Sequence, residues 1–91
     1  MPAVCRVGDQ NNNVPPGLIQ EGVSSVMVNG KPIAVVGGKI SPHGKGKHGS
    51  ATVQRGSGSV FAGGKAVTFV GASEDCGHAN QTGSSDVNVG G

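Results

Sequence analysis

A pattern that occurs three times along the chain constrains the fold more than any other feature of the sequence. It reads Gly, three small or polar residues, a β-branched residue, a variable residue, a small apolar residue and then a Gly-containing turn. The copies span residues 22–31, 56–65 and 83–91. Internal self-similarity is typical of architectures in which one supersecondary unit is repeated. We therefore expect residues 1–91 to form a single domain with threefold internal pseudo-symmetry.

The first two copies contain the residues of tight hairpin turns. Asn29-Gly30 and Gly63-Gly64 are dipeptides that accept the positive φ angles of two-residue hairpin turns. A second short apolar segment follows each of these turns. The sequence therefore predicts β-hairpins near residues 22–37 and 56–71.

The third copy has no second segment after its turn, but the N-terminus supplies one. Val4-Cys-Arg-Val-Gly8 matches the segments that follow the first two turns. We expect residues 83–91 to close with residues 2–8, which brings the two termini together. Frequent glycines disfavour helices, although the sequence permits a single helical turn near residues 73–75. The expected fold class is all-β.

The expected core is thin, because Phe61 and Phe69 are the only aromatic residues and glycine occurs 18 times. Small domains bury little apolar surface and commonly need a disulfide, a metal ion or a partner. A disulfide between Cys5 and Cys76 is disfavoured, because the sequence shows no export signal and the compartment is then reducing. Cys5 is interpreted as a packed, unreactive thiol, whereas Cys76 is a candidate metal ligand.

Three polar loops lie between the hairpins: the first at residues 9–21, the second at residues 38–55 and the third at residues 72–82. Candidate metal ligands occur in the second and third of these loops. Four residues separate the two histidines of the second loop, and Cys76-Gly-His78 places a thiol beside an imidazole in the third. Gly77 allows both side chains to aim at one point. If the repeats share an axis, these loops emerge at the same end, and a closed tetrahedral set suits structural Zn²⁺, although iron would also fit. The complete set is His43, His48, Cys76 and His78.

The same residues have simpler interpretations. The histidines of the second loop flank Lys45 and Lys47, as they would in a flexible loop exposed to solvent. Residues 44–49 resemble a phosphate-binding loop but lack the Walker spacing and the helix that follows it. Asp75 is either a carboxylate that orients a ligand imidazole or an ordinary turn residue. The Asn-rich first loop contains neither His nor Cys and contributes no ligand.

The charge pattern argues against a specific nucleic-acid partner. The net charge is +2 with His neutral, and the basic residues are scattered apart from Lys45 and Lys47. A nucleic-acid-binding domain normally concentrates its basic residues on one face. No apolar run is long enough to span a bilayer, and the N-terminus lacks the charged and apolar regions of a signal peptide.

The repeat resembles that of the PAAR-repeat proteins. Residues 29–37, Asn-Gly-Lys-Pro-Ile-Ala-Val-Val-Gly, carry the motif, and residues 2–9, Pro-Ala-Val-Cys-Arg-Val-Gly-Asp, carry a second copy. Residues 64–71 form a looser third copy. The arginine that gives the motif its name is replaced by Val35 and Phe69 in the later copies. These departures touch strand positions and leave the expected fold unchanged, but they argue against a role for that arginine in this chain.

The resemblance implies a conical fold with metal-binding loops at its vertex, where three histidines and one cysteine hold a single metal ion. It implies a structural, non-enzymatic tip that caps the trimeric β-helical spike of a contractile phage tail or a type VI secretion system, with one copy per trimer. Such a tip contacts the target membrane transiently and has no small-molecule substrate. Its location is the virion tail tip, or the bacterial cytoplasm before delivery by type VI secretion. Since the repeats reach Gly91, no effector extension is expected.

Three similar hairpins offer three similar surfaces to a threefold-symmetric partner. Strand alternation places Val26 and Val28 on one face of the first hairpin and Met27 on the other. The residues expected to build the docking base, or the layer just above it, are Val26, Val28, Val60 and Val87. The competing interpretation is a small zinc-stabilised module that binds nucleic acid or protein.

Overall fold

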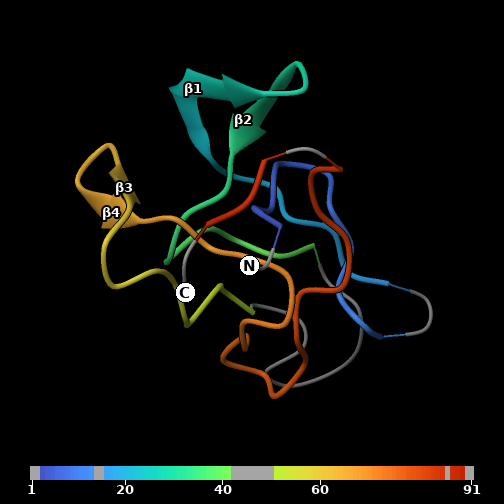
Figure 1. Cartoon of the computed structure of the whole chain (residues 1–91). Coiled ribbons are helices and arrows are strands. Elements are labelled where there is room, and N and C mark those ends of the chain that lie inside the picture. The colour runs from blue at the N-terminus through green and yellow to red at the C-terminus, as the bar shows by residue number, and fades with distance from the viewer. Residues whose placement is uncertain (1–2, 14–15, 42–50, 86, 90–91) are drawn as a thin grey trace.

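The computed structural model of the chain describes residues 3–13, 16–41, 51–85 and 87–89. Two antiparallel hairpins stand out in it: β1 (Val23–Val28) pairs with β2 (Lys31–Ile33), and β3 (Phe61–Ala62) pairs with β4 (Lys65–Ala66). Figure 1 shows them at the top and the left of the molecule, with irregular loops filling the remainder. The described ranges contain no helix, so the all-β fold class is confirmed and none of them provides a membrane-spanning helix.

Both hairpin turns occur at the predicted dipeptides. Asn29 and Gly30 have φ angles of 54° and 80°, and Gly63 and Gly64 have φ angles of 58° and 79°. Two successive positive φ values define the type I′ turn, whose twist matches that of the flanking strands. Asparagine is one of the few non-glycine residues that accepts this region of backbone space.

The N-terminus completes the third repeat by pairing with the C-terminal segment. Ala3 forms an antiparallel bridge with Asn88, and the Val4 amide donates to the Val87 carbonyl at 3.0 Å. The N-terminal segment occupies the place that β2 and β4 take in the first two hairpins. The chain therefore closes on itself.

Three backbone hydrogen bonds join the repeats in a ring around a pseudo-threefold axis. The Cys5 amide donates to the Thr68 carbonyl at 3.1 Å, the Thr68 amide to Ala34 at 3.1 Å, and the Ala34 amide to Cys5 at 2.9 Å. All three residues are fully buried. Because each residue both donates and accepts, displacement of any one repeat breaks two of the three hydrogen bonds.

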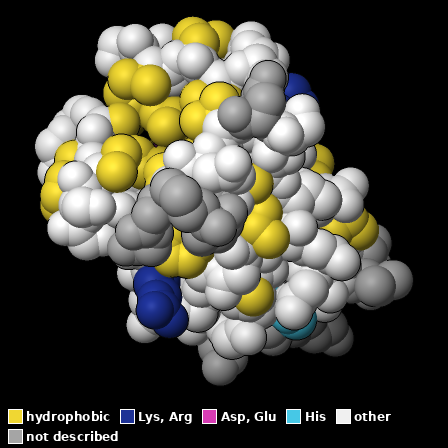
Figure 2. Space-filling model, viewed as in Figure 1, with side chains coloured by type: hydrophobic (Ala, Val, Ile, Leu, Met, Phe, Trp, Pro, Cys, Tyr) yellow, Lys and Arg dark blue, Asp and Glu magenta, His cyan; other side chains and the backbone are white. Residues whose placement is uncertain are grey.

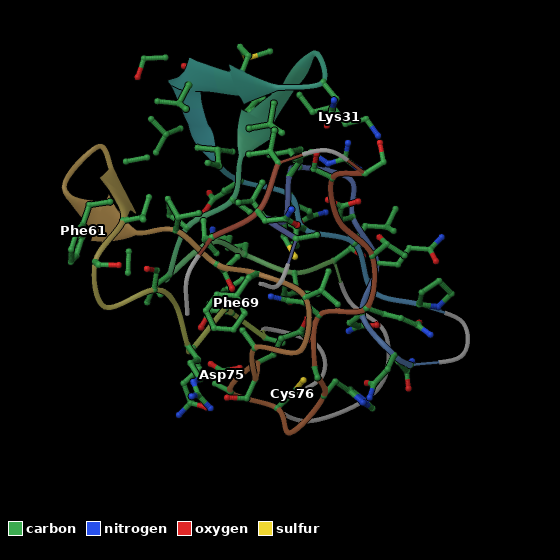
Figure 3. The ribbon with its side chains drawn as sticks, viewed as in Figure 1. Lys31, Phe61, Phe69, Asp75 and Cys76 are labelled. Carbon is green, nitrogen blue, oxygen red and sulfur yellow. The ribbon has the colours of Figure 1, made fainter. Side chains whose placement is uncertain are left out.

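Side chains pack above and below this ring in two apolar clusters. One lies beneath the hairpins and includes Val28, Phe69 and Val89, and the other lies toward the loops and includes Ile19, Ile40 and Cys76. Figure 3 shows Phe69 inside the molecule. Cys5 and Cys76 both belong to the second cluster as free thiols, so the packing relies on apolar contacts and not on a disulfide.

Strand alternation does not describe β1, and that prediction was wrong. Val26 and Met27 are both exposed, whereas Val28 is buried. The pairing register shifts between Val23 and Met27, and an irregularity of this kind breaks the two-residue period of side-chain direction. Val28 is therefore a buried residue of the apolar cluster beneath the hairpins, whereas Val26 is exposed.

The arginine of the first motif copy does have a role, contrary to the expectation from its later replacements. Arg6 makes a two-pronged ion pair with the buried Asp9, in which both distances are 3.0 Å. The same guanidinium donates to the Asn29 side chain at 3.1 Å and to the Gly83 carbonyl at 3.3 Å. Arg6 thus ties the N-terminal segment to the first hairpin turn and to the third repeat.

This ion pair predicts an acid-sensitive stability. Burial of Asp9 alone would raise its pKa, but hydrogen bonds from Arg6 and Thr82 outweigh burial and hold the pKa below its usual value of 3.8. A carboxylate with a depressed folded-state pKa stabilises the fold above its unfolded-state pKa, and that contribution is lost as the pH falls through the folded-state value. We expect the free energy of unfolding to fall more steeply below about pH 4 in the wild type than in Asp9→Asn. Urea titrations between pH 7 and pH 2 measure this, and equal slopes would contradict it.

Candidate functional site

A tight turn in the third loop carries Cys76 and His78. The Gly77 amide donates to the Glu74 carbonyl at 3.1 Å, and the Glu74 amide donates to the His78 carbonyl at 2.7 Å. Gly77 has a φ angle of 95°, the left-handed conformation that glycine adopts without steric cost. Glu74 also bridges to Val53 as extended backbone, so the single helical turn that the sequence permits near residues 73–75 does not form.

The two side chains on this turn differ in exposure. Cys76 is buried, whereas His78 is partly exposed. Figure 3 places Cys76 near the edge of the molecule that lies opposite Lys31 and the first hairpin turn. A thiolate and an imidazole are the donor types that Zn²⁺ and similar soft cations prefer, so the chemistry of this pair fits the expected metal.

His43 and His48 lie outside the described residues. The described arms on either side of them are nevertheless joined, since the Ile40 amide donates to the Ala51 carbonyl at 2.9 Å. Among the described residues, His78 and Cys76 are the members of the predicted set, and no cluster of three or more potential ligands occurs there.

Asp75 fastens the second loop to the third. Its two carboxylate oxygens accept hydrogen bonds from the Thr52 amide at 3.0 Å and the Thr52 hydroxyl at 2.9 Å, and its own amide donates to the Thr52 carbonyl. Asp75 is therefore a turn residue whose carboxylate and amide both bind Thr52. Through this link, the arm that returns from the second loop lies next to the turn with Cys76.

Sequence reasoning missed a buried carboxyl group beside Cys76. Glu74 is 1% exposed, and its Oε1 accepts a hydrogen bond from the Asn11 amide group at 3.0 Å and lies 3.8 Å from the Cys76 sulfur. A single glutamate in a polar loop carries no sequence signal of burial. Asn11 and Glu74 together link the first loop to the third.

The first loop also contacts His78 directly. Asn12 Oδ1 lies 3.1 Å from His78 Nδ1 and accepts a hydrogen bond from the Ala79 amide at 3.2 Å. The sequence marked this loop only by its run of asparagines and by its lack of His and Cys. No pattern in the sequence pairs Asn12 with His78, because 66 residues separate them.

The hairpin end of the molecule presents a second candidate site, an exposed apolar face. Val26, Val60 and Val87 occupy corresponding positions in the three repeats and are 39%, 39% and 38% exposed. Met27 and Phe61, which follow the first two valines, are 54% and 60% exposed. Figure 2 shows apolar side chains gathered over and between the two hairpins, and Figure 3 shows Phe61 on the outer side of the β3–β4 hairpin. This face has the composition of a protein-docking surface.

A groove between the two hairpins adjoins this face. Its walls include Val23 and Pro32 from the first hairpin and Gly63 and Lys65 from the second. It offers a concave surface next to the convex hairpin tips.

The comparison with protein families identifies the repeat. The family described as the PAAR motif matches residues 7–79, which is most of the chain. A search of curated proteins found no match to this sequence. The matched region includes both hairpins, the residues of the central ring other than Cys5, and the turn with Cys76 and His78. The chain therefore belongs to the PAAR-motif family.

Proposed function

We propose that this protein is the metal-stabilised tip of a contractile injection machine, and that its hairpin face sits on the blunt end of a trimeric β-helical spike. The PAAR motif implies association with the spike of such a machine. One copy caps one trimer. The role is structural and not catalytic, and the tip touches the target membrane transiently during piercing.

The observation that carries this proposal is the equal exposure of Val26, Val60 and Val87. Because these valines occupy corresponding positions in the three repeats, the apolar surface that they form is itself repeated. Here the ring of three backbone hydrogen bonds sets the axis, and the three valines lie at 38–39% exposure around it. A threefold homotrimer presents three identical sites in that arrangement, so one chain can engage all three subunits.

The proposed metal centre lies at the other end of the molecule. We assign its ligands as His43, His48, Cys76 and His78, and the ion as one structural Zn²⁺ per chain, with iron as the alternative. The buried thiol, the left-handed turn at Gly77 and the link between Asp75 and Thr52 support this assignment. A closed set of four protein ligands supplies rigidity and leaves no coordination position for catalysis.

Binding to a spike trimer tests the docking proposal. The purified chain is mixed with the trimeric β-helical spike from the same gene cluster, and native mass spectrometry is expected to give one chain per trimer. Val60→Asp places a charge at the docking face, and we expect it to weaken binding about 30-fold or more, as for the loss of an interface hot spot.

The matched control is Leu18→Asp, because Leu18 is also 39% exposed but lies in the first loop rather than on the hairpins. We expect it to leave spike binding unchanged. Equal losses in the two variants would contradict the assignment of the docking face. Two or three chains per trimer would contradict the stoichiometry, and salt-dependent DNA binding without spike binding would favour the binding-module alternative.

A further inference from the structure

We propose that Asn12 is a positioning residue that fixes the tautomer of His78, so that His78 binds the metal through Nε2. This inference rests on the proposed metal centre. It assigns a function to the first loop, which supplies no ligand of its own.

Backbone hydrogen bonds hold Asn12 and the two residues before it against the third loop. The Asn12 amide donates to the Ala79 carbonyl at 3.0 Å, and Asn11 forms an antiparallel bridge with Asn80. The amides of Gln81 and Thr82 both donate to the Gln10 carbonyl. The first loop is thus paired with the third along residues 10–12, and this pairing fixes the position of the Asn12 backbone.

The neighbouring amide decides which atom of the Asn12 side chain faces His78. The Ala79 N–H can only donate a hydrogen bond, so the atom that it reaches at 3.2 Å must be the side-chain oxygen and not the nitrogen. That same oxygen lies 3.1 Å from His78 Nδ1. An amide oxygen can only accept, so Nδ1 must carry the proton in this contact.

A neutral imidazole with its proton on Nδ1 has its lone pair on Nε2. A metal requires that lone pair, and an acceptor on the other ring nitrogen is the usual device that orients a ligand histidine. The carbonyl oxygen of Asn12 performs this task without adding a charge to the centre.

The other two repeats show what this position does in the absence of a histidine. A side-chain oxygen accepts a hydrogen bond from the backbone amide of a neighbouring loop at each of the three corresponding positions. The pairs are Ala79 with Asn12 at 3.2 Å, Leu18 with Ser41 at 2.8 Å, and Thr52 with Asp75 at 3.0 Å. The backbone contact is therefore a common structural feature, and the contact with an imidazole is an addition specific to Asn12.

This comparison supplies matched variants. Asn12→Ser keeps the hydroxyl acceptor that Ser41 uses for the backbone contact, but its shorter side chain does not reach His78. Asn12→Asp keeps an acceptor of full length, as Asp75 does. Gln10→Ala removes an exposed side chain from the same loop and serves as the control.

The primary measurement is the ¹⁵N chemical shift of both His78 ring nitrogens, recorded with and without Zn²⁺ at a pH where imidazole is neutral. The wild type, Asn12→Asp and Gln10→Ala are expected to show a protonated Nδ1 without metal and an Nε2-bound ion with Zn²⁺. Asn12→Ser is expected to lose the Nδ1–H preference and to release Zn²⁺ to a chelator about tenfold faster or more.

Two kinds of failure are distinguishable. Zn²⁺ bound through Nδ1 in the wild type, or wild-type shifts and release rates in Asn12→Ser, would overturn the role of Asn12 and leave the metal centre standing. A wild-type protein that holds the Nδ1–H tautomer but binds no Zn²⁺ would overturn the metal centre, and with it the proposed purpose of the contact.

Discussion

Replacement of Gly83 by alanine is expected to lower the free energy of unfolding by about 2–3 kcal/mol, because the closure of the chain leaves no room for a side chain there. A Cβ atom at this position would lie 2.6 Å from the Val4 carbonyl oxygen and 2.8 Å from a Val70 methyl group. The carbonyl cannot move aside freely, since it accepts a hydrogen bond from the Ser84 amide at 2.8 Å. Relief of the overlap therefore has to loosen the pairing between the two ends of the chain.

The same crowding occurs at the two other glycines that begin the repeats. A Cβ at Gly22 would overlap the Ile33 carbonyl oxygen, and one at Gly56 would lie 2.7 Å from a Val36 methyl group. The three positions are equivalent, so alanine at each is expected to be destabilising. Their crowding is the physical reason that the repeat begins with glycine.

Gly58→Ala is the matched control for Gly83→Ala. Gly58 is exposed, and a Cβ there would meet no atom within 4 Å, so we expect a change of no more than about 0.5 kcal/mol. Urea unfolding of both variants gives the comparison, and hydrogen exchange of the Val4 and Ser84 amides reports whether the closure opens locally. Equal stability of the two variants would show that the closure tolerates a side chain, contrary to the packing described above.

The cyclic closure could be predicted because its determinants are local and repeated. The turn dipeptides at 29–30 and 63–64 specify hairpins through backbone φ angles alone. The segment at Val4 could be recognised as the missing strand because it has the same pattern as the segments after the other turns. Because the same pattern occurs three times, three local signals that are weak individually together predict one topology.

The arrangement of the candidate site depends on contacts between distant segments, which no local sequence pattern indicates. Glu74 is buried because Asn11, 63 residues away, hydrogen-bonds its carboxyl group. His78 meets Asn12 only because the first and third loops pair as extended backbone. The exposure of both Val26 and Met27 follows from a register shift that alternation alone does not anticipate. These features arise from how the repeats pack together, and that packing could not be predicted from the local patterns of a single sequence.

Replacement of Cys76 by serine is expected to abolish tight metal binding and to remove the stability that the metal supplies. Elemental analysis of the wild type should give about one zinc or iron per chain, as a four-ligand site requires. A ligand that binds only the folded state stabilises it by about 4 kcal/mol at a thousandfold excess over its Kd. The wild type should therefore unfold at a lower temperature in the presence of a strong chelator, whereas Cys76→Ser should be insensitive to the chelator.

Cys5→Ala is the control that separates metal ligation from the loss of any buried thiol. Burial and the nearby Asp9 carboxylate raise the pKa of Cys5 to about 12, so this sulfur stays protonated and is a poor metal ligand. Alanine already occupies the equivalent position in the first repeat at Ala34, so the ring has room for it. We expect Cys5→Ala to keep its metal and its response to the chelator.

The comparison also distinguishes packing from ligation at Cys76 itself. If Cys76 only filled space in the second apolar cluster, Cys76→Ser and Cys5→Ala would both be modestly less stable than the wild type. The chelator would then leave the unfolding temperature of all three proteins unchanged. A chelator response that disappears in Cys76→Ser alone requires the sulfur of Cys76 to hold the ion. In that case the thin core is supported at its loop end by metal coordination, and the tip gains rigidity at the end that meets the target first.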